Sequence, residues 1–417
     1  MKNKCVILLI TAMCAAFTLR AQSPPGLSLD ECMKIALEQN PLILSALQQY
    51  QASLARVNQA KAFPQPSLNW DSDLQPRLFK FRNTGEWYFG LSQPIEFPGK
   101  RYLRGKIATR ESDEFLQDIN LLKLDIAFQV KQAFYGLLLA QEKLKYVQQD
   151  LGLSRDFLEN AELKFDAGDV AKVEVLRAKV EVSKAANELR KATNEVRLAK
   201  AYLNFLMARK KYTPLEISGN LRKNPISLDL EALKERALSF RPEMKRINLS
   251  LERERLQKKQ AYMSYLPDFE LGVNRHHVEG EGSWWDVTLS FPLPLFFWQP
   301  AKGEIAEAQA NMKSLGREAD HLINFIGLEV EESYMNALSA SNQIQLFEEE
   351  ILTQAEEVYN MFLFSYQEGE IGGIELIEAR RTLIEARTSY AEALFNYGAA
   401  LAALEKSIGQ ELEGASQ

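Results

Sequence analysis

The two halves of the chain repeat each other, which constrains the fold more than any other feature of its 417 residues. The segment Lys164–Ala178 aligns without gaps to Ser365–Ala379 at a constant offset of 201, and Leu91–Pro94 parallels Leu289–Pro292 at an offset of 198. A repeat of this length indicates that one structural unit has been built twice. Each unit is expected to contain a helix, two strands, a long helix, a tight turn and a second helix.

The first residues have the composition of a secretory signal peptide. Lys2 and Lys4 precede an apolar run from Val6 to Leu19, and Ala21 is a small residue at a suitable cleavage position. The expected organisation is therefore a signal peptide over residues 1–21, a first repeat over 22–215, a linker over 216–227, a second repeat over 228–412 and a tail over 413–417.

Two stretches without proline are long enough to form unusually long helices. Proline, which breaks helix interiors, is absent from Arg101 to Thr213 and from Ala301 to the last residue. Helices are expected from about Lys100 to Asp166 and from about Lys302 to Glu368, some 67 residues each. At 1.5 Å per residue each would reach roughly 100 Å, far more than the thickness of a bilayer. Apolar residues recur every three or four positions, a spacing typical of amphipathic or coiled-coil helices, as in Leu122, Ile126, Val130, Phe134 and Leu137.

Short segments near the start of each repeat alternate apolar and polar residues, which predicts strands with one apolar and one wet face. The apolar positions are Leu68, Trp70, Leu74, Trp87, Phe89, Leu91, Phe269, Leu271, Val273, Trp285, Val287, Leu289 and Phe291. The tryptophans, Trp70, Trp87, Trp284, Trp285 and Trp298, all lie in or beside these segments and none in the helices. Because tryptophan favours the membrane–water interface, we expect these rings to mark one. A small soluble sheet packed by aromatic rings is the alternative.

The membrane hypothesis restricts how the strands can be used. After the signal peptide, no segment has the roughly 20 apolar residues that a membrane-spanning helix needs, so only strands could enter a bilayer. Four strands cannot close a barrel, and an open sheet edge in lipid leaves backbone groups unpaired. Several subunits are therefore expected to share one barrel, which indicates a bacterial outer membrane.

Several other classes of protein are not supported by the residues. The signal peptide contains three of the 50 basic residues and none of the 56 acidic ones, so the mature chain has a net charge near −9 and no sign of nucleic-acid binding. No metal site is expected, because His321 stands alone and the adjacent His276 and His277 are placed in an outer loop ending at Ser283. No phosphate-binding loop or hydrolase motif is present, so we expect neither an enzyme nor a cofactor. Cys32 is the one cysteine of the mature chain, so an intramolecular disulfide is not expected.

Several short segments, each weak alone, occur in a characteristic order and spacing. They are Leu27–Pro41, Arg241-Pro-Glu243, the strand starts after Pro64 and Pro267, and the turns around Gly168 and Gly369. Together they resemble the TolC-like outer-membrane efflux protein family, over nearly the whole mature chain. Three further segments are more similar to the metal-efflux branch typified by CzcC and CusC than to TolC itself: Gln93–Arg101, Phe291–Leu295 and Lys302–Ile305.

The resemblance implies an assembly as well as a fold. Each protomer would be mainly helical with a small β part, built from long antiparallel coiled-coil hairpins and four membrane strands. Three protomers would form a homotrimer with a twelve-stranded barrel in outer-membrane lipid and a helical tunnel in the periplasm. The trimer would work with a periplasmic adaptor protein and an inner-membrane pump of RND or ABC type.

The resemblance also places two helix–turn–helix tips in the periplasm, where the adaptor would dock. These tips are Gly168, Asp169 and Val170 in the first repeat and Gly369, Glu370, Ile371 and Gly372 in the second. Glycine adopts positive φ without a steric clash, so the three glycines are equally expected as ordinary turn residues.

Acidic residues just beyond the second tip are the candidate gate. Glu375 and Glu378 lie one turn apart on one expected helix face. The matching positions of the family hold acids, there aspartates, that constrict the periplasmic end of the tunnel, and three copies would form two rings that favour cations. In the first repeat Glu174 matches Glu375, but Arg177 replaces Glu378, so we expect Arg177 to pair with a neighbouring acid. The alternative is that these acids only complement the helix dipole.

The sequence therefore predicts a passive outer-membrane exit duct for metal cations or small molecules delivered by an inner-membrane pump. The metal preference rests on the resemblance alone, because the methionines from Met33 to Met361 do not cluster. Two other functions remain open: an exit duct for secreted polypeptides, and a periplasmic coiled-coil structural protein.

Overall fold

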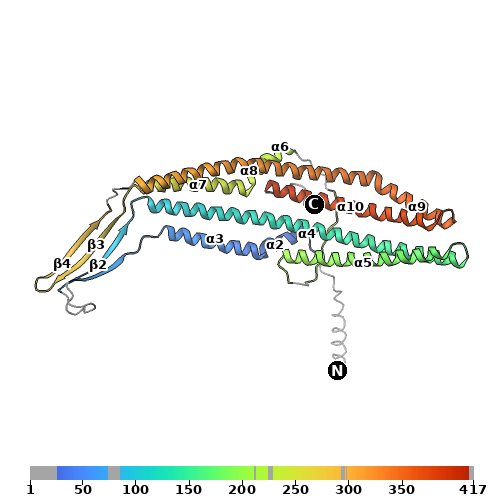
Figure 1. The fold of residues 1–417 in the computed structure, drawn as a ribbon, viewed down its shortest axis with the longest axis horizontal. Helices are drawn as coiled ribbons and strands as arrows, with labels where there is room; N and C mark the ends of the chain where they lie inside the picture. Colours follow the sequence, from blue (N-terminus) through green and yellow to red (C-terminus); the bar gives the residue numbers. More distant parts are fainter. Residues whose placement is uncertain are drawn as a thin grey trace, which may run out of the picture. The chain divides into compact units, whose positions relative to one another are not determined.

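The computed structural model describes residues 26–73, 85–210, 213–223, 229–292, 296 and 298–412. The expected signal peptide, Leu74 and the expected tail lie outside these ranges. Within them the chain is mainly helical and its strands form one small sheet (Figure 1), which confirms the predicted fold class. None of the described helices has the length and apolar character needed to cross a membrane.

The same order of elements occurs twice, as the internal repeat predicts. The first copy contains α2 (Leu29–Gln39), α3 (Pro41–Ala60), β1 (Ser67–Asp73), β2 (Glu86–Ile95), α4 (Lys100–Asp166) and α5 (Lys172–Leu206). The second contains α6 (Leu230–Phe240), α7 (Pro242–Met263), β3 (Phe269–Val278), β4 (Gly282–Ser290), α8 (Trp298–Leu346), a π-helical turn η2 (Phe347–Ile351), α9 (Leu352–Glu368) and α10 (Gly373–Ile408). Each copy opens with two helices rather than one, because Pro41 and Pro242 begin a new helix, where a missing N–H is harmless.

Helix α4 has the bounds expected from the sequence and runs for 67 residues without a break. Its counterpart differs, because it begins at Trp298, before the expected start at Lys302, and the π-helical turn η2 separates α8 from α9. The expectation that no tryptophan lies in a helix is therefore wrong for Trp298, whose side chain lies outside the description. A π-helical turn adds a residue to a helix, which a hydrophobic period does not reveal.

The four strands form one antiparallel sheet in the order β1-β2-β3-β4. Leu91 of β2 lies opposite both Leu68 of β1 and Val273 of β3, and Val273 lies opposite Val287 of β4. The register therefore places the predicted apolar positions on one face, which confirms the alternation seen in the sequence. The exposed large side chains of this face are Leu68, Trp70, Phe89, Leu91, Leu271, Val273, Trp285, Val287 and Leu289. So large an exposed apolar face marks a surface for lipid or for another protein.

The turn between β3 and β4 is shorter than expected. The sequence predicts an outer loop from His276 to Ser283, but the strands leave only residues 279–281 between them. Nε2 of His276 lies 2.6 Å from Oε1 of Glu86 on the polar face. Nδ1 of His277 instead lies 2.9 Å from Oγ of Ser283, because successive strand residues point to opposite faces.

The chain forms two compact units, and each contains parts of both repeats. Of the described residues, one unit contains those within 26–37, 129–223 and 341–399, and therefore contains α5, α9, the second half of α4 and most of α10. The other contains the described residues within 38–128, 229–340 and 400–412, with the sheet, α3, α6, α7 and most of α8. The helix–turn–helix tips belong to the first unit and the strands to the second.

Alanine at every seventh position explains how α5 and α10 pack in the first unit. Seven residues are close to two helical turns, so such a set forms a row along one face. Small side chains in a row allow neighbouring helices to approach closely, since the distance between helix axes depends on the residues at the contact. The buried alanines are Ala178, Ala185 and Ala192 of α5 and, 201 residues later in each case, Ala379, Ala386 and Ala393 of α10. Phe157, Val175, Tyr366, Leu376 and Ile377 are buried in the same cluster as Ala178.

In the second unit, the Arg241-Pro-Glu243 segment joins three helices. The Arg241 side chain is only 6% exposed and forms ion pairs with Glu243 of α7 and Glu329 of α8. Its Nη1 also donates to the backbone oxygen of Ser407, near the end of α10, at 3.4 Å. One buried cation thus connects the start of α7 to α8 and to the last turn of α10.

Candidate functional site: the helix–turn–helix tips

The two tips connect α4 to α5, the first hairpin, and α9 to α10, the second hairpin, and they have the same backbone geometry. Gly168 and Gly369 adopt left-handed conformations with φ of 87° and 80°. The amide of Asp169 donates to the carbonyl of Lys164 at 2.9 Å, and the equivalent bond of the second turn is also 2.9 Å. This is the Schellman motif, which requires a residue that tolerates positive φ, so the expected use of glycine is confirmed at both positions. A Cβ added to either glycine would contact nothing within 4 Å, so only the backbone conformation selects glycine here.

The remaining tip residues differ in exposure. Asp169 and Glu370 are exposed, whereas Val170 and Ile371 are half-buried. Ile371 packs against the apolar cluster of the first unit. Gly372 is exposed but is not in the left-handed region, so the turn does not need glycine there.

A tyrosine of α9 connects the two hairpins. Tyr366 is 2% exposed, and its hydroxyl donates to Oε1 of Glu174 in α5 at 3.1 Å. Burial raises the pKa of the Tyr366 hydroxyl and the Glu174 carboxylate raises it further, so the hydroxyl keeps its proton and remains a donor. Lys164 of α4 lies over the same ring, 4.4 Å from its centre, and donates to the Tyr366 backbone oxygen. Both helices of the first hairpin therefore hold this residue of the second.

Glu375 and Glu378 are exposed and lie one turn apart on α10. Glu378 is not an isolated charge, because its Oε1 lies 2.9 Å from Nη1 of Arg381. Nη2 of Arg381 lies 2.9 Å from Oε1 of Glu181 in α5. The acidic pair beside the second tip is therefore connected to the first hairpin through an arginine.

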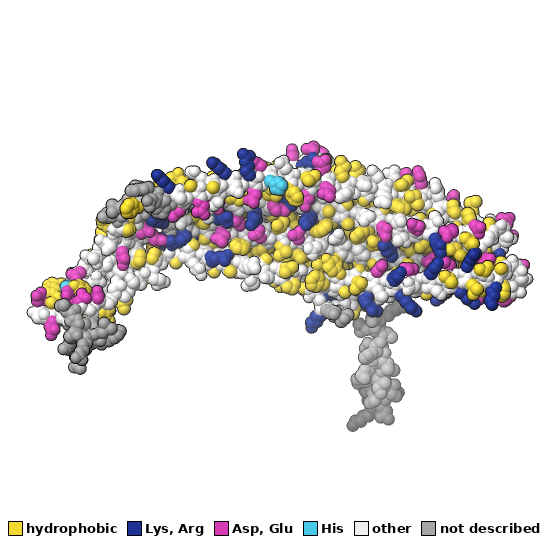
Figure 2. Space-filling model, viewed as in Figure 1, with side chains coloured by type: hydrophobic (Ala, Val, Ile, Leu, Met, Phe, Trp, Pro, Cys, Tyr) yellow, Lys and Arg dark blue, Asp and Glu magenta, His cyan; other side chains and the backbone are white. Residues whose placement is uncertain are grey.

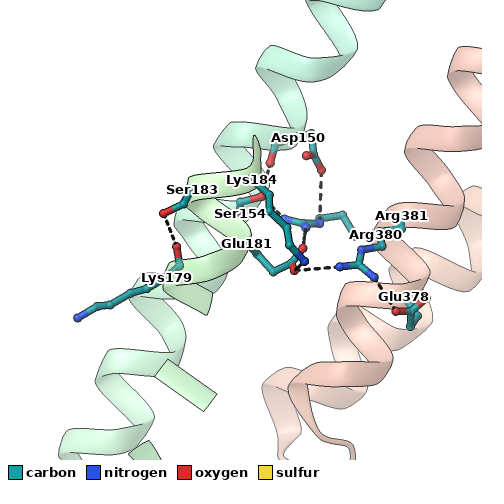
Figure 3. A network of polar contacts seen from close by, with 9 residues as sticks. All are labelled: Asp150, Ser154, Lys179, Glu181, Ser183, Lys184, Glu378, Arg380 and Arg381. Atoms are coloured by element: carbon teal, nitrogen blue, oxygen red, sulfur yellow. Dashed lines mark hydrogen bonds and ion pairs between the residues drawn. The ribbon is translucent and has the colours of Figure 1, made fainter. Parts of the chain in front are cut away.

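A buried arginine is the centre of a polar network between the hairpins (Figure 3). The Arg380 side chain is 6% exposed, and its Nη2 lies 3.2 Å from Oε2 of Glu181. Nη1 donates to Oγ of Ser154 in α4, and Nε lies 3.4 Å from Oδ1 of Asp150. This side chain of α10 thus contacts both helices of the first hairpin.

The two acids of this network respond differently to their surroundings. Burial raises the pKa of Asp150 above its ordinary value, and the Arg380 guanidinium offsets this only in part. Burial also acts to raise the pKa of Glu181, but hydrogen bonds from Lys184 and Arg381 outweigh it and lower the pKa. The carboxylate form of Glu181 is therefore the more strongly stabilised of the two.

Arg177 does not form the contact expected for it. It is exposed and lines a groove between α5 and α10 that also contains Glu378 and Arg381. Within the part of the chain that the structure describes, Arg177 forms no ion pair with a neighbouring acid, and Arg381 pairs with Glu378 instead.

The arginine at position 177 is one of a row rather than a single substitution. Basic residues recur every seven positions along α5, and α10 has acidic residues at the equivalent positions. The basic residues are Arg177, Lys184 and Lys191, and their counterparts 201 residues later are Glu378, Glu385 and Glu392. Figure 2 shows Lys and Arg side chains gathered over the region of α5. The hairpins therefore carry opposite charges at equivalent positions over about four helical turns.

The polar network is the part of the site that sequence reasoning missed. Its members are Asp150, Ser154, Glu181, Arg380 and Arg381. Charged residues within an amphipathic pattern are normally read as a solvated face. A signal was present in the Arg380-Arg381 doublet, which directly follows Ala379 in the alanine row of α10.

The tryptophans expected at a membrane interface divide between the two faces of the sheet. Trp70 and Trp285 are exposed on the apolar face, and Trp87 is half-buried on the same face. Trp284 lies on the opposite, polar face, because it is adjacent to Trp285 in β4. Their position at an interface stays a prediction.

Comparison with known proteins identifies the family. The family model described as outer membrane efflux protein matches residues 33–209 and 233–410, which together make up most of the chain. The chain belongs to the outer membrane efflux protein family. It is therefore an outer-membrane efflux channel with helices in the periplasm, the exit duct of a system that also contains an adaptor and an inner-membrane pump. This membership decides against a periplasmic coiled-coil structural protein.

Individual relatives of this efflux protein agree with the membership. The cobalt-zinc-cadmium resistance protein CzcC of Cupriavidus metallidurans is 25% identical over 386 residues, 89% of this chain and 87% of CzcC. The solved structure of CusC matches with a TM-score of 0.78 at 16% identity, and the match covers 92% of each chain. VceC of Vibrio cholerae matches with a TM-score of 0.76 at 16% identity over 92% of this chain and 97% of VceC. The similarity to CzcC and CusC expected from the sequence is confirmed.

Proposed function

We propose that this efflux protein is the exit duct of a metal-cation efflux system and that its tips form a gate at the periplasmic end. The observation that carries the gate is the set of contacts that bind the second hairpin to the first. Tyr366 donates to Glu174, and Arg380 and Arg381 both contact Glu181. These contacts lie within about three helical turns of the tips. Contacts at this place resist separation of the hairpins, so the duct can widen there only when they break.

The proposed channel is a homotrimer. β1 and β4 are the two edges of the sheet, and edge strands carry unpaired N–H and C=O groups. Pairing of these edges among three copies would satisfy the groups in lipid and close a twelve-stranded barrel. The exposed apolar face, with Trp70 and Trp285, would then contact the lipid.

Metal cations are the proposed cargo. CzcC, at 25% identity, is a cobalt-zinc-cadmium resistance protein. In a trimer Glu375 and Glu378 would form two acidic rings, which attract cations and repel anions. Arg381 neutralises part of the Glu378 charge, so Glu375 would supply the stronger attraction.

The partners of the duct are part of the same proposal. An adaptor would dock on the two tips, at residues 168–170 and 369–372, and an inner-membrane pump of RND or ABC type would deliver the cargo. The duct would be passive, without a cofactor or a catalytic step. The exposed acidic residues of the tips, Asp169 and Glu370, offer polar contacts to such an adaptor.

Single-channel conductance in planar bilayers tests the gate. The wild type is compared with Glu375→Ala plus Glu378→Ala, and with Glu159→Ala plus Glu357→Ala, which removes the same charge from other exposed helix positions. We expect small cation-selective pores in the wild type and the control, and wider pores without that selectivity in the first variant. Unchanged selectivity in that variant would remove the gate from the proposal. A wild type that never conducts would contradict the duct itself.

A further inference from the structure

A groove beside the start of α4 combines apolar and cationic side chains. It lies in the unit that contains the sheet, between the end of α3 and the connection from β2 to α4, and has a volume of about 1020 Å³. Phe63, Ile95, Phe97 and Tyr102 supply apolar surface. Phe63 and Tyr102 are 73% and 64% exposed, which is unusual for large aromatic rings in a single chain.

Several cations line the same groove, and three of them form no ion pair with a carboxylate of the described residues. These three are Lys61, Arg101 and Lys106. The Arg101 guanidinium lies 3.5 Å from the centre of the Phe63 ring, and Nζ of Lys106 lies 5.4 Å from that of Tyr102. Such cation–π contacts orient a cation without neutralising its charge.

Two neighbouring arginines, Arg104 and Arg110, differ from these three cations because carboxylates of the protein neutralise their charge. Arg104 pairs with Glu96, and its Nε donates to the backbone oxygen of Ala60 at 2.8 Å. Arg110 lies 2.9 Å from both Asp113 and Glu252. The acids near the groove are therefore already paired, and the three remaining cations leave it with a net positive charge.

The walls of the groove are held in place by specific contacts. Nζ of Lys100 lies 2.8 Å from Oδ1 of Asp268, which also accepts from the amide of Phe97 at 2.7 Å. The stem of Lys61 packs across Gly105, where an added Cβ would lie only 2.8 Å from Cγ of Lys61. Glycine at position 105 therefore makes room for one of the three cations.

We propose that this groove binds the phosphate of an anionic phospholipid in the periplasmic leaflet of the outer membrane. β2 ends at Ile95 and α4 begins at Lys100, so the groove lies where the membrane strands give way to the periplasmic helices. Lipid headgroups are found at this depth, and basic pockets and aromatic rings at this depth recognise them. The cations would contact the phosphate, and Phe63 and Tyr102 would contact the glycerol and the upper acyl chain. The inference rests on the outer-membrane location of the channel. It adds that the protein prefers anionic lipids to neutral ones.

The lipids that the protein retains test this proposal. The full mature chain is reconstituted in mixtures of phosphatidylcholine and phosphatidylglycerol, and bound lipids are counted by native mass spectrometry. Each surface cation is worth about a fivefold preference, so we expect the wild type to favour phosphatidylglycerol by up to about 100-fold. The variant Lys61→Gln, Arg101→Gln, Lys106→Gln should lose most of this preference.

A matched control removes the same number of charges elsewhere. Lys123→Gln, Arg155→Gln, Lys313→Gln changes three exposed cations outside the groove and should keep the preference. Both variants should conduct like the wild type, so a failure of the lipid proposal is distinguishable from a failure of the duct. A wild type without preference, or equal losses in the two variants, would overturn the proposal.

Two further results would assign the groove to another occupant. Crosslinking between subunits by a photoreactive label attached at Phe63→Cys would show that a neighbouring copy covers the groove. Displacement of the lipid by inorganic phosphate alone would indicate a site for a free anion. We expect neither, because the apolar side chains beside the cations suit a lipid better than either a polar anion or the charged surface of a helix.

Discussion

The first and second hairpins share a backbone and differ in what their side chains do. Their turns and their alanine rows coincide at an offset of 201 residues, yet Phe165 is 40% exposed and its counterpart Tyr366 is 2% exposed. Lys179 pairs with Glu162 at the surface, whereas its counterpart Arg380 is buried. The two copies therefore keep the same backbone frame, but Tyr366 and Arg380, which join the hairpins, have no buried equivalent in the first copy.

The difference has an energetic consequence. The side chains of Lys179 and Glu162 are 54% and 48% exposed, so water screens their attraction and the pair contributes little. Loss of Arg380 would remove the buried positive charge that Asp150 and Glu181 both contact. Leaving a buried charge without its partner costs folding free energy. Equivalent substitutions in the two hairpins are therefore expected to have unequal effects.

The largest expected effect is that of Arg380→Ala. We expect a loss of about 3 kcal/mol in the free energy of local opening, because a buried ion pair loses one partner. Hydrogen exchange of the backbone amides of α5 and α10 measures this quantity. The matched change Lys179→Ala should cost less than about 1 kcal/mol. Equal losses in the two variants would show that the two hairpins are energetically alike at these positions.

Next in size is Tyr366→Phe, which makes the second hairpin like the first at this position. It removes a hydrogen bond to a carboxylate, worth about 1.5 kcal/mol, which corresponds to roughly a tenfold increase in the open population. Single-channel recordings give the open probability. The reverse change Phe165→Tyr should have no effect, since the ring at 165 is already exposed. An unchanged open probability in Tyr366→Phe would exclude this bond from the gate.

The two tips should lose similar amounts of stability when their glycines are replaced. Gly168→Ala and Gly369→Ala each place a Cβ on a residue with positive φ, at a cost of about 1 kcal/mol. The space around both is open, so no steric contact distinguishes them. Hydrogen exchange at the two turns measures each cost. A difference larger than about 0.5 kcal/mol would show that something outside a single chain contacts one tip.

The smallest expected effect is on the dependence of stability on pH. The pKa of Glu181 is lowered, so its stabilising contribution is complete above the ordinary value of 4.5 and is lost as the pH falls below it. The pKa of Asp150 is raised, so protonation of Asp150 favours the fold as the pH falls toward 3.8. The two contributions have opposite signs and partly cancel.

Melting temperatures between about pH 6 and pH 3 test this cancellation. Glu181→Gln should flatten the acid loss of stability, because one of the carboxylates with a lowered pKa no longer titrates. Asp150→Asn should steepen the loss, because the opposing gain disappears. Parallel curves for the two variants would contradict the assignment.

The helices and turns were largely predictable from the sequence, whereas the polar network around Arg380 was not. The bounds of α4 follow from the absence of proline, and Gly168 and Gly369 follow from the repeat, since these are local properties of the chain. The burial of Arg380 depends on Ser154 and Glu181, which are 226 and 199 residues away in the sequence. No local period contains that information. The same holds for η2, whose extra residue leaves the apolar spacing on either side unchanged.

The alanine rows of α5 and α10 also determine how these hairpins can be displaced. Ala178 and Ala185 are buried, and a methyl group inserts less deeply into a neighbouring helix than a leucine side chain does. We therefore expect the alanine rows to offer little resistance to a lengthwise shift of one helix against its neighbour. The charged contacts of Arg380 and Arg381 then hold one hairpin at a fixed position along the other. If those contacts break, we expect one hairpin to shift lengthwise against the other more easily than helices that interlock through leucines.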